Sequence, residues 1–336
     1  MGVKCLNQFV RRECPGAIKT VAFADLSGKI VVVDASIYMY RFMADQALLE
    51  NMYSMITLFQ MRGIVPIFIF DGKPPNEKRH LLNRRTRLKR IAETHYNQVK
   101  TTLDLTCCRR TLHDEHLLKA LKRRFIRLHD ADFERVKALM QSLGVSFIVA
   151  PGEADALCAQ MVLKRKAHAC VSDDTDMFVY GCPRVLRQLN LLDETMTMYN
   201  MTQILNLLGI TMTEFRQICV VSGTDYACTN ATNHAKAFHL NLNPTLKLFK
   251  QYKKCAQDAC QADTIVATDF YTWLHHNCST IYPRVRFDYT AMTAINDMFD
   301  MTTHSKLQQL PTLHKNTNID RALLRTVMAH ENFIFV

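Results

Sequence analysis

Four short apolar runs mark the first half of the chain, and longer polar stretches of helical character separate them. Each run has the length of a strand, carries almost no charge and is rich in Val, Ile or Phe. The runs are Ile30–Val33, Ile64–Phe70, Val145–Val149 and Ala167–Val171. Because strands that alternate with helices form parallel sheets covered on both faces, the pattern predicts an α/β fold with a mainly parallel central sheet flanked by helices.

Acidic residues follow all four runs. The first run is followed by Asp34, the second by Asp71, the third by Glu153 and Asp155, and the fourth by Asp173, Asp174 and Asp176. The carboxyl ends of parallel strands meet at one edge of a sheet, where such folds bind their ligands. Asp and Glu also favour turns and helix N-termini, which explains one or two of these positions but not the doubled pairs. We therefore expect a shared carboxylate site at this edge.

Divalent cations would neutralise such a cluster. Carboxylate oxygens suit Mg²⁺ or Mn²⁺, and no His or Cys lies within these motifs, which argues against zinc. Two such ions about 4 Å apart form the usual clamp for phosphodiester hydrolysis. A further candidate follows a later apolar stretch and a glycine, which makes seven: Asp34, Asp71, Glu153, Asp155, Asp174, Asp176 and Asp225. By spacing alone, Asp173 could replace either of its acidic neighbours.

A polar, helical segment at about residues 76–132 is long for a connection inside an α/β domain, so we expect it to project from the body. It holds two basic runs: Lys78, Arg79, Arg84, Arg85, Arg87, Lys89 and Arg90, then Lys119, Lys122, Arg123, Arg124 and Arg127. Solvated helix faces usually mix signs, whereas runs of one sign fit contacts with phosphates. The net charge of +11 also favours an anionic partner such as nucleic acid.

Five motifs resemble, in order and with similar gaps, those of the flap endonuclease group of the XPG/Rad2 5′-nucleases. They are Met1-Gly2-Val3-Lys4, Val33-Asp34-Ala35-Ser36, Phe70-Asp71-Gly72-Lys73-Pro74-Pro75, Pro151-Gly152-Glu153-Ala154-Asp155-Ala156 and Ser222-Gly223-Thr224-Asp225-Tyr226. Asp174-x-Asp176 takes the place of the family's D-x-D, which makes Asp173 the weaker ligand candidate. The resemblance covers residues 1 to about 226. It implies a PIN-like nuclease fold for residues 1–226, with residues 76–132 as a helical arch around the 5′ single strand.

The resemblance also implies two Mg²⁺ ions, for which Mn²⁺ can substitute. Asp34, Asp71 and Glu153 would favour one ion, Asp174, Asp176 and Asp225 the other, and Asp155 would lie between them. Lys78 and Arg85 match a basic pair that contacts the scissile phosphate, and Tyr40 matches an aromatic residue that stacks on the neighbouring base. Gly2 matches the residue whose processed amino terminus helps to form the site. The other basic residues of the segment would bind DNA: Arg84, Arg87, Lys89, Arg90, Lys119, Lys122, Arg123, Arg124 and Arg127.

The function implied is a structure-specific 5′-flap endonuclease and 5′→3′ exonuclease, acting on DNA in replication, repair or recombination. The same site could serve RNA or four-way junctions instead. An alternative of another class is a catalytically silent DNA-binding scaffold, although such a protein has no physical need to keep seven mutually repulsive carboxylates. We expect a monomer in the nucleus or another DNA-replication compartment, and a viral or otherwise specialised member would suit the divergence described next.

The cysteines, the N-terminus and the last hundred residues bear on the cellular compartment and on the role of the C-terminal region. The 12 cysteines include no C-x-x-C pair, and no signal peptide or long apolar run is visible. We therefore expect reduced thiols in an intracellular protein without a membrane span. Residues 227–336 read as a divergent helical region that would contact DNA. They contain no sliding-clamp motif of the form Q-x-x-[ILM]-x-x-aromatic-aromatic.

The segment Ala227–Ala235 is where the family has a G-x-G-x-x-x-A turn that holds a potassium ion, and here it contains no glycine. Such a turn needs tight backbone, which glycine allows at little steric cost. We therefore predict that flap cleavage at matched ionic strength depends little on whether the salt is KCl or NaCl. A several-fold preference for potassium would show that the turn persists without glycine.

Overall fold

The computed structural model describes residues 2–105, 111–226, 240–261, 269–281, 287–301, 318–329 and 333, with only the backbone described at 258–261, 278, 279 and 281. Within these ranges, seven strands form one sheet in the order β1-β7-β6-β5-β2-β3-β4. The strands are β1 (Ile18–Ala22), β2 (Ile30–Asp34), β3 (Val65–Phe70), β4 (Ser146–Val149), β5 (Ala169–Val171), β6 (Arg184–Asn190) and β7 (Thr195–Asn200). The neighbours from β6 to β4 are parallel, and β7 pairs antiparallel with β6 and β1.

The predicted α/β class and mainly parallel sheet are confirmed. The four predicted strands are β2 to β5, with boundaries that differ by two residues or fewer. The strands β1, β6 and β7, which are joined by the two antiparallel pairings of the sheet, were missed. They lie at one side of the sheet, and β1 and β7 are partly exposed, so Lys, Thr, Arg and Asn interrupt the apolar run that marks a strand buried on both faces.

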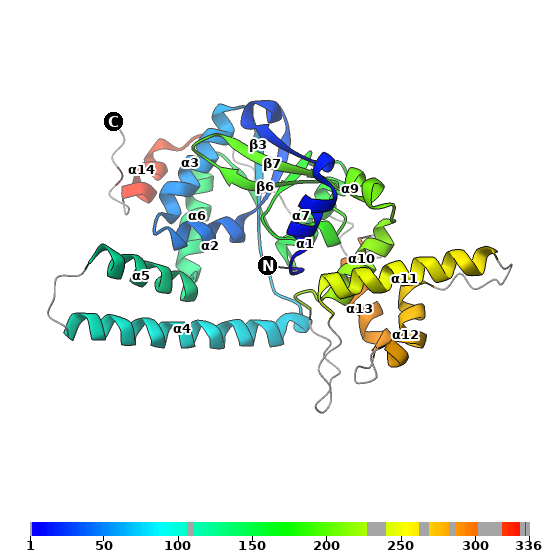
Figure 1. Cartoon of the computed structure of the whole chain (residues 1–336). Coiled ribbons are helices and arrows are strands. Elements are labelled where there is room, and N and C mark those ends of the chain that lie inside the picture. The colour runs from blue at the N-terminus through cyan, green and yellow to red at the C-terminus, as the bar shows by residue number, and fades with distance from the viewer. Residues whose placement is uncertain are drawn as a thin grey trace.

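Two helical layers cover the sheet because alternate residues of its strands face opposite sides. Val32, Ile67 and Cys170 face one apolar cluster, whereas Val31, Val33 and Phe68 face the other. The first layer comprises α1 (Leu6–Glu13), α7 (Ala154–Leu163), α8 (Asp176–Val179), α9 (Met201–Leu208) and α10 (Met212–Ser222). The second comprises α2 (Ala35–Ala44), α3 (Leu48–Met61), α6 (Asp130–Ser142) and α14 (Arg321–Ala329) (Figure 1).

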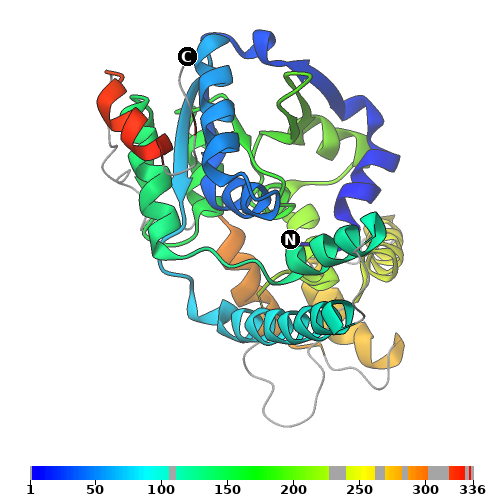
Figure 2. The same cartoon turned by 90° about the vertical axis from the view of Figure 1, so that its left-hand side faces the viewer.

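The helices after the nuclease motifs go to two places. α11 (Leu242–Gln261), α12 (Phe270–Ile281) and α13 (Tyr289–Phe299) pack beside α10 and extend its layer. α14 instead returns to the opposite face of the sheet and packs on α6, as Figure 2 shows. The described part of the region after residue 226 is mainly helical. Its helices pack on both faces of the sheet and do not form a separate layer.

The polar segment that was expected to project does so. α4 (Arg79–Leu105) and α5 (Leu112–Lys122) lie side by side and stand away from the body (Figures 1 and 2). No residue of α4 is buried in the structure. Tyr96 packs on Phe125 with ring centroids 5.3 Å apart, and Arg123 donates to Asp45 at 2.8 Å at the turn after α2. We call α4, α5 and the short 3₁₀ helices η3 (Asn76–Lys78) and η4 (Arg123–Phe125) the arch segment.

Two more 3₁₀ helices, η1 (Pro15–Ala17) and η2 (Phe23–Leu26), flank β1. The seven cysteines whose side chains the structure describes form no disulfide with one another. Among the described helices, no single one has both the length and the apolar character to cross a membrane. α9 and α10 meet that test only as a pair, bent by 86°.

Gly72 joins the loops that follow β3 and β4. Its backbone N–H donates to the carbonyl oxygen of Gly152 at 2.7 Å, and a Cβ at position 72 would lie 1.9 Å from the carbonyl oxygen of Ala150. We predict that Gly72→Ala forces these loops apart and lowers the free energy of unfolding by about 1–3 kcal/mol in a denaturant titration. Gly16→Ala is the control, because a Cβ at position 16 meets nothing within 4 Å. Equal losses in the two variants would contradict this packing.

Candidate metal and phosphate site

The seven predicted carboxylates lie on elements that end or begin at the carboxyl edge of the parallel strands. Asp34 ends β2 and caps α2, and Asp71 directly follows β3. Glu153 caps α7, and Asp155 lies in its first turn. Asp174 follows β5, Asp176 begins α8, and Asp225 follows the end of α10. The strand-end pattern therefore predicted their common location.

Hydrogen bonds connect these strand ends to each other. Asp71 Oδ1 accepts from the backbone N–H of Ala154 at 2.9 Å, which ties the end of β3 to the start of α7. Ser172 Oγ donates to Asp34 Oδ2 at 3.1 Å, which ties β5 to β2. These two bonds hold Asp71 and Asp34 against the elements that carry their neighbours in the cluster.

Burial and mutual repulsion raise the pKa values of three of these carboxylates. Burial, with repulsion by Asp71 and Asp174, raises the pKa of Asp34 to about 7. Burial and the charges of Asp34 and Asp174 likewise raise the pKa of Asp155. Burial raises the pKa of Asp176 too, together with its neighbours Asp174, Asp225 and Glu153. All seven carboxylates therefore belong to one electrostatic cluster.

Asp176 is a buried carboxylate without a hydrogen-bond partner among the described residues. The residue is 1% exposed, and neither of its carboxylate oxygens has a hydrogen-bond partner. A buried carboxylate without a partner is costly, and a divalent cation supplies the missing charge. An all-oxygen donor set also fits Mg²⁺ or Mn²⁺. The described side chains contain no ready-made group of three or more metal ligands, so a cation would have to draw the carboxylates closer together.

Two cations of the arch segment reach into the cluster. Lys78 Nζ lies 2.6 Å from Glu153 Oε1, and Arg85 donates to Asp225 Oδ2 at 2.6 Å. Lys78 is 7% exposed, and nearby carboxylates raise its pKa against the lowering effect of burial. The basic pair implied by the resemblance therefore lies beside two of the seven carboxylates, one from each expected metal group.

Tyr40 and Gly2 also lie at the site. Tyr40 is 41% exposed, and Lys89 Nζ lies 4.9 Å from its ring centroid. Partial burial, together with the charge of Asp71, raises the pKa of the Tyr40 hydroxyl. A Cβ at Gly2, where φ is +77°, would lie 2.4 Å from Asp176 Oδ1. The backbone of residue 2 therefore approaches the carboxylates as closely as only glycine permits.

Asp173 is directed away from the cluster. Its carboxylate accepts from the backbone N–H of Gln188 at 2.8 Å and lies 3.8 Å from Arg41. These contacts give Asp173 a structural partner on β6 and another on α2. They support Asp174 and Asp176 as the ligand pair, the choice that the resemblance also implies.

The predicted DNA-binding residues line the arch segment but differ in their partners. Nearly all of them are exposed: Arg84, Arg87, Arg90, Lys119, Lys122, Arg123, Arg124 and Arg127, with Lys89 half-buried. Two already form ion pairs, Arg123 with Asp45 and Arg127 with Glu93 at 2.6 Å. Exposed ion pairs are weak, so these two arginines could still exchange their partners for phosphates.

Sequence reasoning missed two residues that orient this site. Tyr226 donates to Glu153 Oε2 at 2.5 Å, and its ring lies 4.6 Å from Lys78 Nζ. Arg187 is 8% exposed, stacks on Phe178, and donates to the backbone carbonyl of Asp173. Both contacts join residues far apart in sequence. The only available signal was that Tyr226 follows Asp225 in the last motif.

The glycine-free segment Ala227–Ala235 lies outside the described residues, so the expectation about potassium stays a prediction.

Comparison with known proteins places this site in a family. Residues 1–92 match the model of the XPG N-terminal domain, and residues 144–225 match that of the XPG I-region. Flap endonuclease 1-B of Oryza sativa subsp. indica is 30% identical over 249 residues, which is 68% of this chain and 58% of the relative. Flap endonuclease 1 of Cryptosporidium parvum is 29% identical over 293 residues, 75% of this chain and 57% of the relative. The chain thus spans less than two thirds of these relatives.

Solved structures share the fold. The catalytic core of Rad2 in complex with a DNA substrate (complex III) superposes with a TM-score of 0.63 at 19% identity, covering 98% of this chain and 95% of that one. Flap endonuclease-1 from Methanococcus jannaschii gives 0.57 at 21% identity, covering 94% and 91%. Human GEN1 in complex with Holliday junction DNA gives 0.57 at 16% identity, covering 98% and 73%.

We predict that Asp176→Asn abolishes cleavage and leaves DNA binding nearly unchanged. Asn keeps the size of the side chain but loses the charge that would hold a cation. The expected rate loss is about a thousandfold or more in single-turnover cleavage with Mg²⁺, while affinity for the same DNA in Ca²⁺ stays within a few-fold. In metal-free buffer, the melting temperature should not fall, because Asn also removes like-charge repulsion. Cleavage within about tenfold of the parent would exclude Asp176 from the metal site.

Proposed function

The chain belongs to the XPG/Rad2 family of structure-specific 5′-nucleases, and on that premise we propose that it is a 5′-flap endonuclease and 5′→3′ exonuclease. Its substrate would be DNA with a 5′ flap or a junction of single strand and duplex, met in replication, repair or recombination. It would act as a monomer, in the nucleus or another DNA-replication compartment.

The observation that supports this proposal best is the pairing of arch cations with metal-site carboxylates. Lys78 is held at Glu153 and Arg85 at Asp225, each at 2.6 Å. A phosphodiester bound over the carboxylates would offer both cations a new anionic partner. The arch segment carries further basic residues away from this point, along a path that a single strand could follow.

The carboxylates would hold two divalent ions: Asp34, Asp71 and Glu153 for one, Asp174, Asp176 and Asp225 for the other, with Asp155 between them. When bound, such ions supply an activated water and stabilise charge on the reacting phosphate. The chain's own groups then have separate tasks. Lys78 and Arg85 neutralise the phosphate, Tyr40 offers an exposed ring to the adjacent base, and Tyr226 orients Glu153.

The same site could cut other substrates, because metals and phosphate do not distinguish flaps from junctions or from RNA. The likeness to GEN1, which was solved with Holliday junction DNA, favours the four-way junction as the second candidate. A silent scaffold is disfavoured by the intact set of repulsive carboxylates. We further propose that the region after residue 226 contacts the duplex.

One assay distinguishes these candidates. Purified protein is incubated with Mg²⁺ or Mn²⁺ and end-labelled flap, nicked, four-way junction and RNA substrates of matched length. Cleavage at the base of the flap supports the proposal, whereas preferred cleavage of four-way junctions or of RNA favours a junction nuclease or an RNA nuclease instead. If none of the four substrates is cut but DNA is still bound, the result favours a catalytically silent scaffold.

We predict different effects for cations at the base of the arch segment and cations farther along it. Lys78→Ala with Arg85→Ala should slow single-turnover cleavage by about a hundredfold or more and weaken binding much less, because their benefit grows as charge develops on the phosphate. Lys119, Lys122 and Arg124 changed to Ala should mainly weaken binding and flatten its salt dependence by about one unit per lost contact.

Arg123 stays unchanged in this comparison, because its substitution would remove its contact with Asp45 as well as a cation. Circular dichroism and melting curves control for folding in both variants. Equal reductions in single-turnover rate at saturating enzyme would contradict the division of roles.

A further inference from the structure

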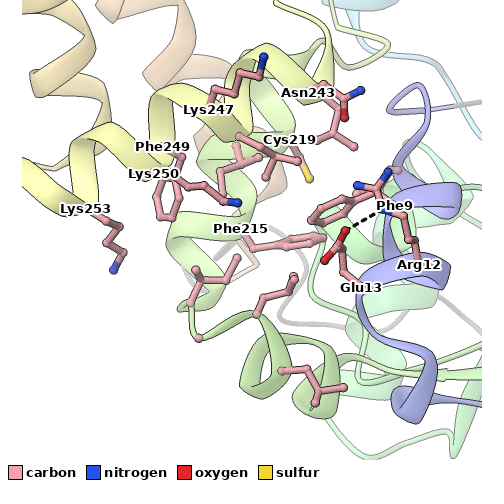
Figure 3. A pocket seen from close by; sticks show the side chains of 18 of the residues that line it. Phe9, Arg12, Glu13, Phe215, Cys219, Asn243, Lys247, Phe249, Lys250 and Lys253 are labelled. Atoms are coloured by element: carbon pink, nitrogen blue, oxygen red, sulfur yellow. Dashed lines mark hydrogen bonds and ion pairs between the residues drawn. The ribbon is translucent and has the colours of Figure 1, made fainter.

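A groove of about 840 Å³ lies between α1, the α9–α10 turn and α11 (Figure 3). None of its lining residues belongs to the carboxylate cluster or to the arch segment. Its floor is apolar: Leu6, Phe215 and Leu242 are buried there, and Phe9 and Leu246 are partly buried. Leu207 borders the groove and is 56% exposed, so part of its apolar lining faces solvent.

The rim of the groove carries a row of positive charge along α11. Lys247, Lys250 and Lys254 follow each other at intervals of three and four residues, so they lie on one helix face. This row runs beside the apolar row of Leu242, Leu246 and Phe249, of which Leu246 and Phe249 each directly precede a lysine of the row. α11 therefore presents two parallel stripes, one apolar and one basic.

These three lysines are not neutralised by the described part of the chain. Arg12 forms an ion pair with Glu13, and Lys253 forms one with Glu214. No such pair joins Lys247, Lys250 or Lys254 to any carboxylate among the described side chains. Figure 3 shows Lys250 extending from α11 toward Phe215. The groove thus combines exposed apolar surface with net positive charge.

We propose that this groove docks an amphipathic acidic helix of a partner protein. Such a helix presents large apolar side chains at i, i+3, i+4 and i+7, which would fill the floor. Acidic residues on its flank would pair with the lysine row. Together these two features match both stripes of α11.

Nucleic acid fits this surface less well. A phosphate backbone could pair with the lysines but offers nothing to the apolar floor. Single strands bind by stacking bases on exposed aromatic rings, yet Phe215 and Phe249 are only 2% and 5% exposed. A peptide uses both the charge and the apolar lining, so the peptide is the occupant that the observations favour.

The probe is a synthetic Trp-free helical peptide with Leu and Phe at the four anchor positions and Glu on the flanks, compared with a scrambled peptide of equal composition. Trp273 is the single Trp of the chain. It stacks on Phe270, which contacts Phe249 behind the groove, so its fluorescence reports binding. Anisotropy of the labelled peptide gives the affinity. We expect saturable binding tighter than about 0.1 mM for the amphipathic peptide alone.

Variants locate the binding. Lys247→Glu with Lys250→Glu and Lys254→Glu should weaken the peptide at least tenfold, and Leu207→Ser, a change at an exposed residue, at least threefold. Lys19→Glu with Lys29→Glu and Lys166→Glu makes the same change of charge at exposed positions outside the groove and should have little effect.

The same proteins are titrated with labelled duplex DNA. If the peptide does not saturate, if the scrambled peptide binds equally, or if both triple variants weaken it alike, the proposal is overturned. It is also overturned if reversal of the groove lysines weakens duplex DNA and leaves the peptide unaffected. Flap cleavage by the parent protein reports on the nuclease proposal separately, because peptide binding needs neither metal nor a DNA substrate.

Discussion

The carboxylates at one edge of the sheet repel each other, and the other features of the site depend on how this repulsion is balanced. Parallel strands place their carboxyl ends at the same edge: β2 ends in Asp34, Asp71 directly follows β3, and Asp174 lies three residues beyond the end of β5. Burial then makes the repulsion costly, as the raised pKa values of Asp34 and Asp155 show. Such a cluster is stable only with cations, whether protons, divalent metals or basic side chains. Protons, divalent metal ions and basic side chains would therefore compete for the carboxylates.

The basic side chains in that competition come from the arch segment. Lys78 directly precedes α4 and Arg85 lies in its second turn, so their pairing with Glu153 and Asp225 holds the base of a helix that buries none of its residues. Metal ions entering the cluster would compete for the same two carboxylates. Release of the two cations would then coincide with the need for positive charge at a bound phosphate. On the proposed function, these two ion pairs would couple cation occupancy to the position of the arch segment and to phosphate binding.

Sequence patterns predicted what depends on burial and strand ends, and missed what depends on tertiary contact. The strands β2 to β5 were readable because they are apolar on both faces, and the shared edge followed from their direction. β1, β6 and β7 were not, since polar residues interrupt their pattern. The resemblance implied that Lys78 and Arg85 contact the scissile phosphate, but not that they pair with Glu153 and Asp225. Tyr226 lies in the last motif, yet neither its role nor that of Arg187 could be inferred, because each acts through a partner distant in sequence.

The cluster residues and the helices after residue 226 occupy separate parts of the chain, so substitutions in those helices need not alter the cluster. All seven carboxylates and both arch cations lie between residues 34 and 225, and Gly2 and Tyr226 add contacts from just outside that span. Helices α11 to α13 pack on α10 through apolar side chains and add no ligand to the cluster among their described residues. Beyond that packing, none of their described side chains belongs to the carboxylate cluster. If the proposed functions hold, substitution on their outer faces would change which duplex or partner protein is bound, while the chemistry of the carboxylate edge would stay the same.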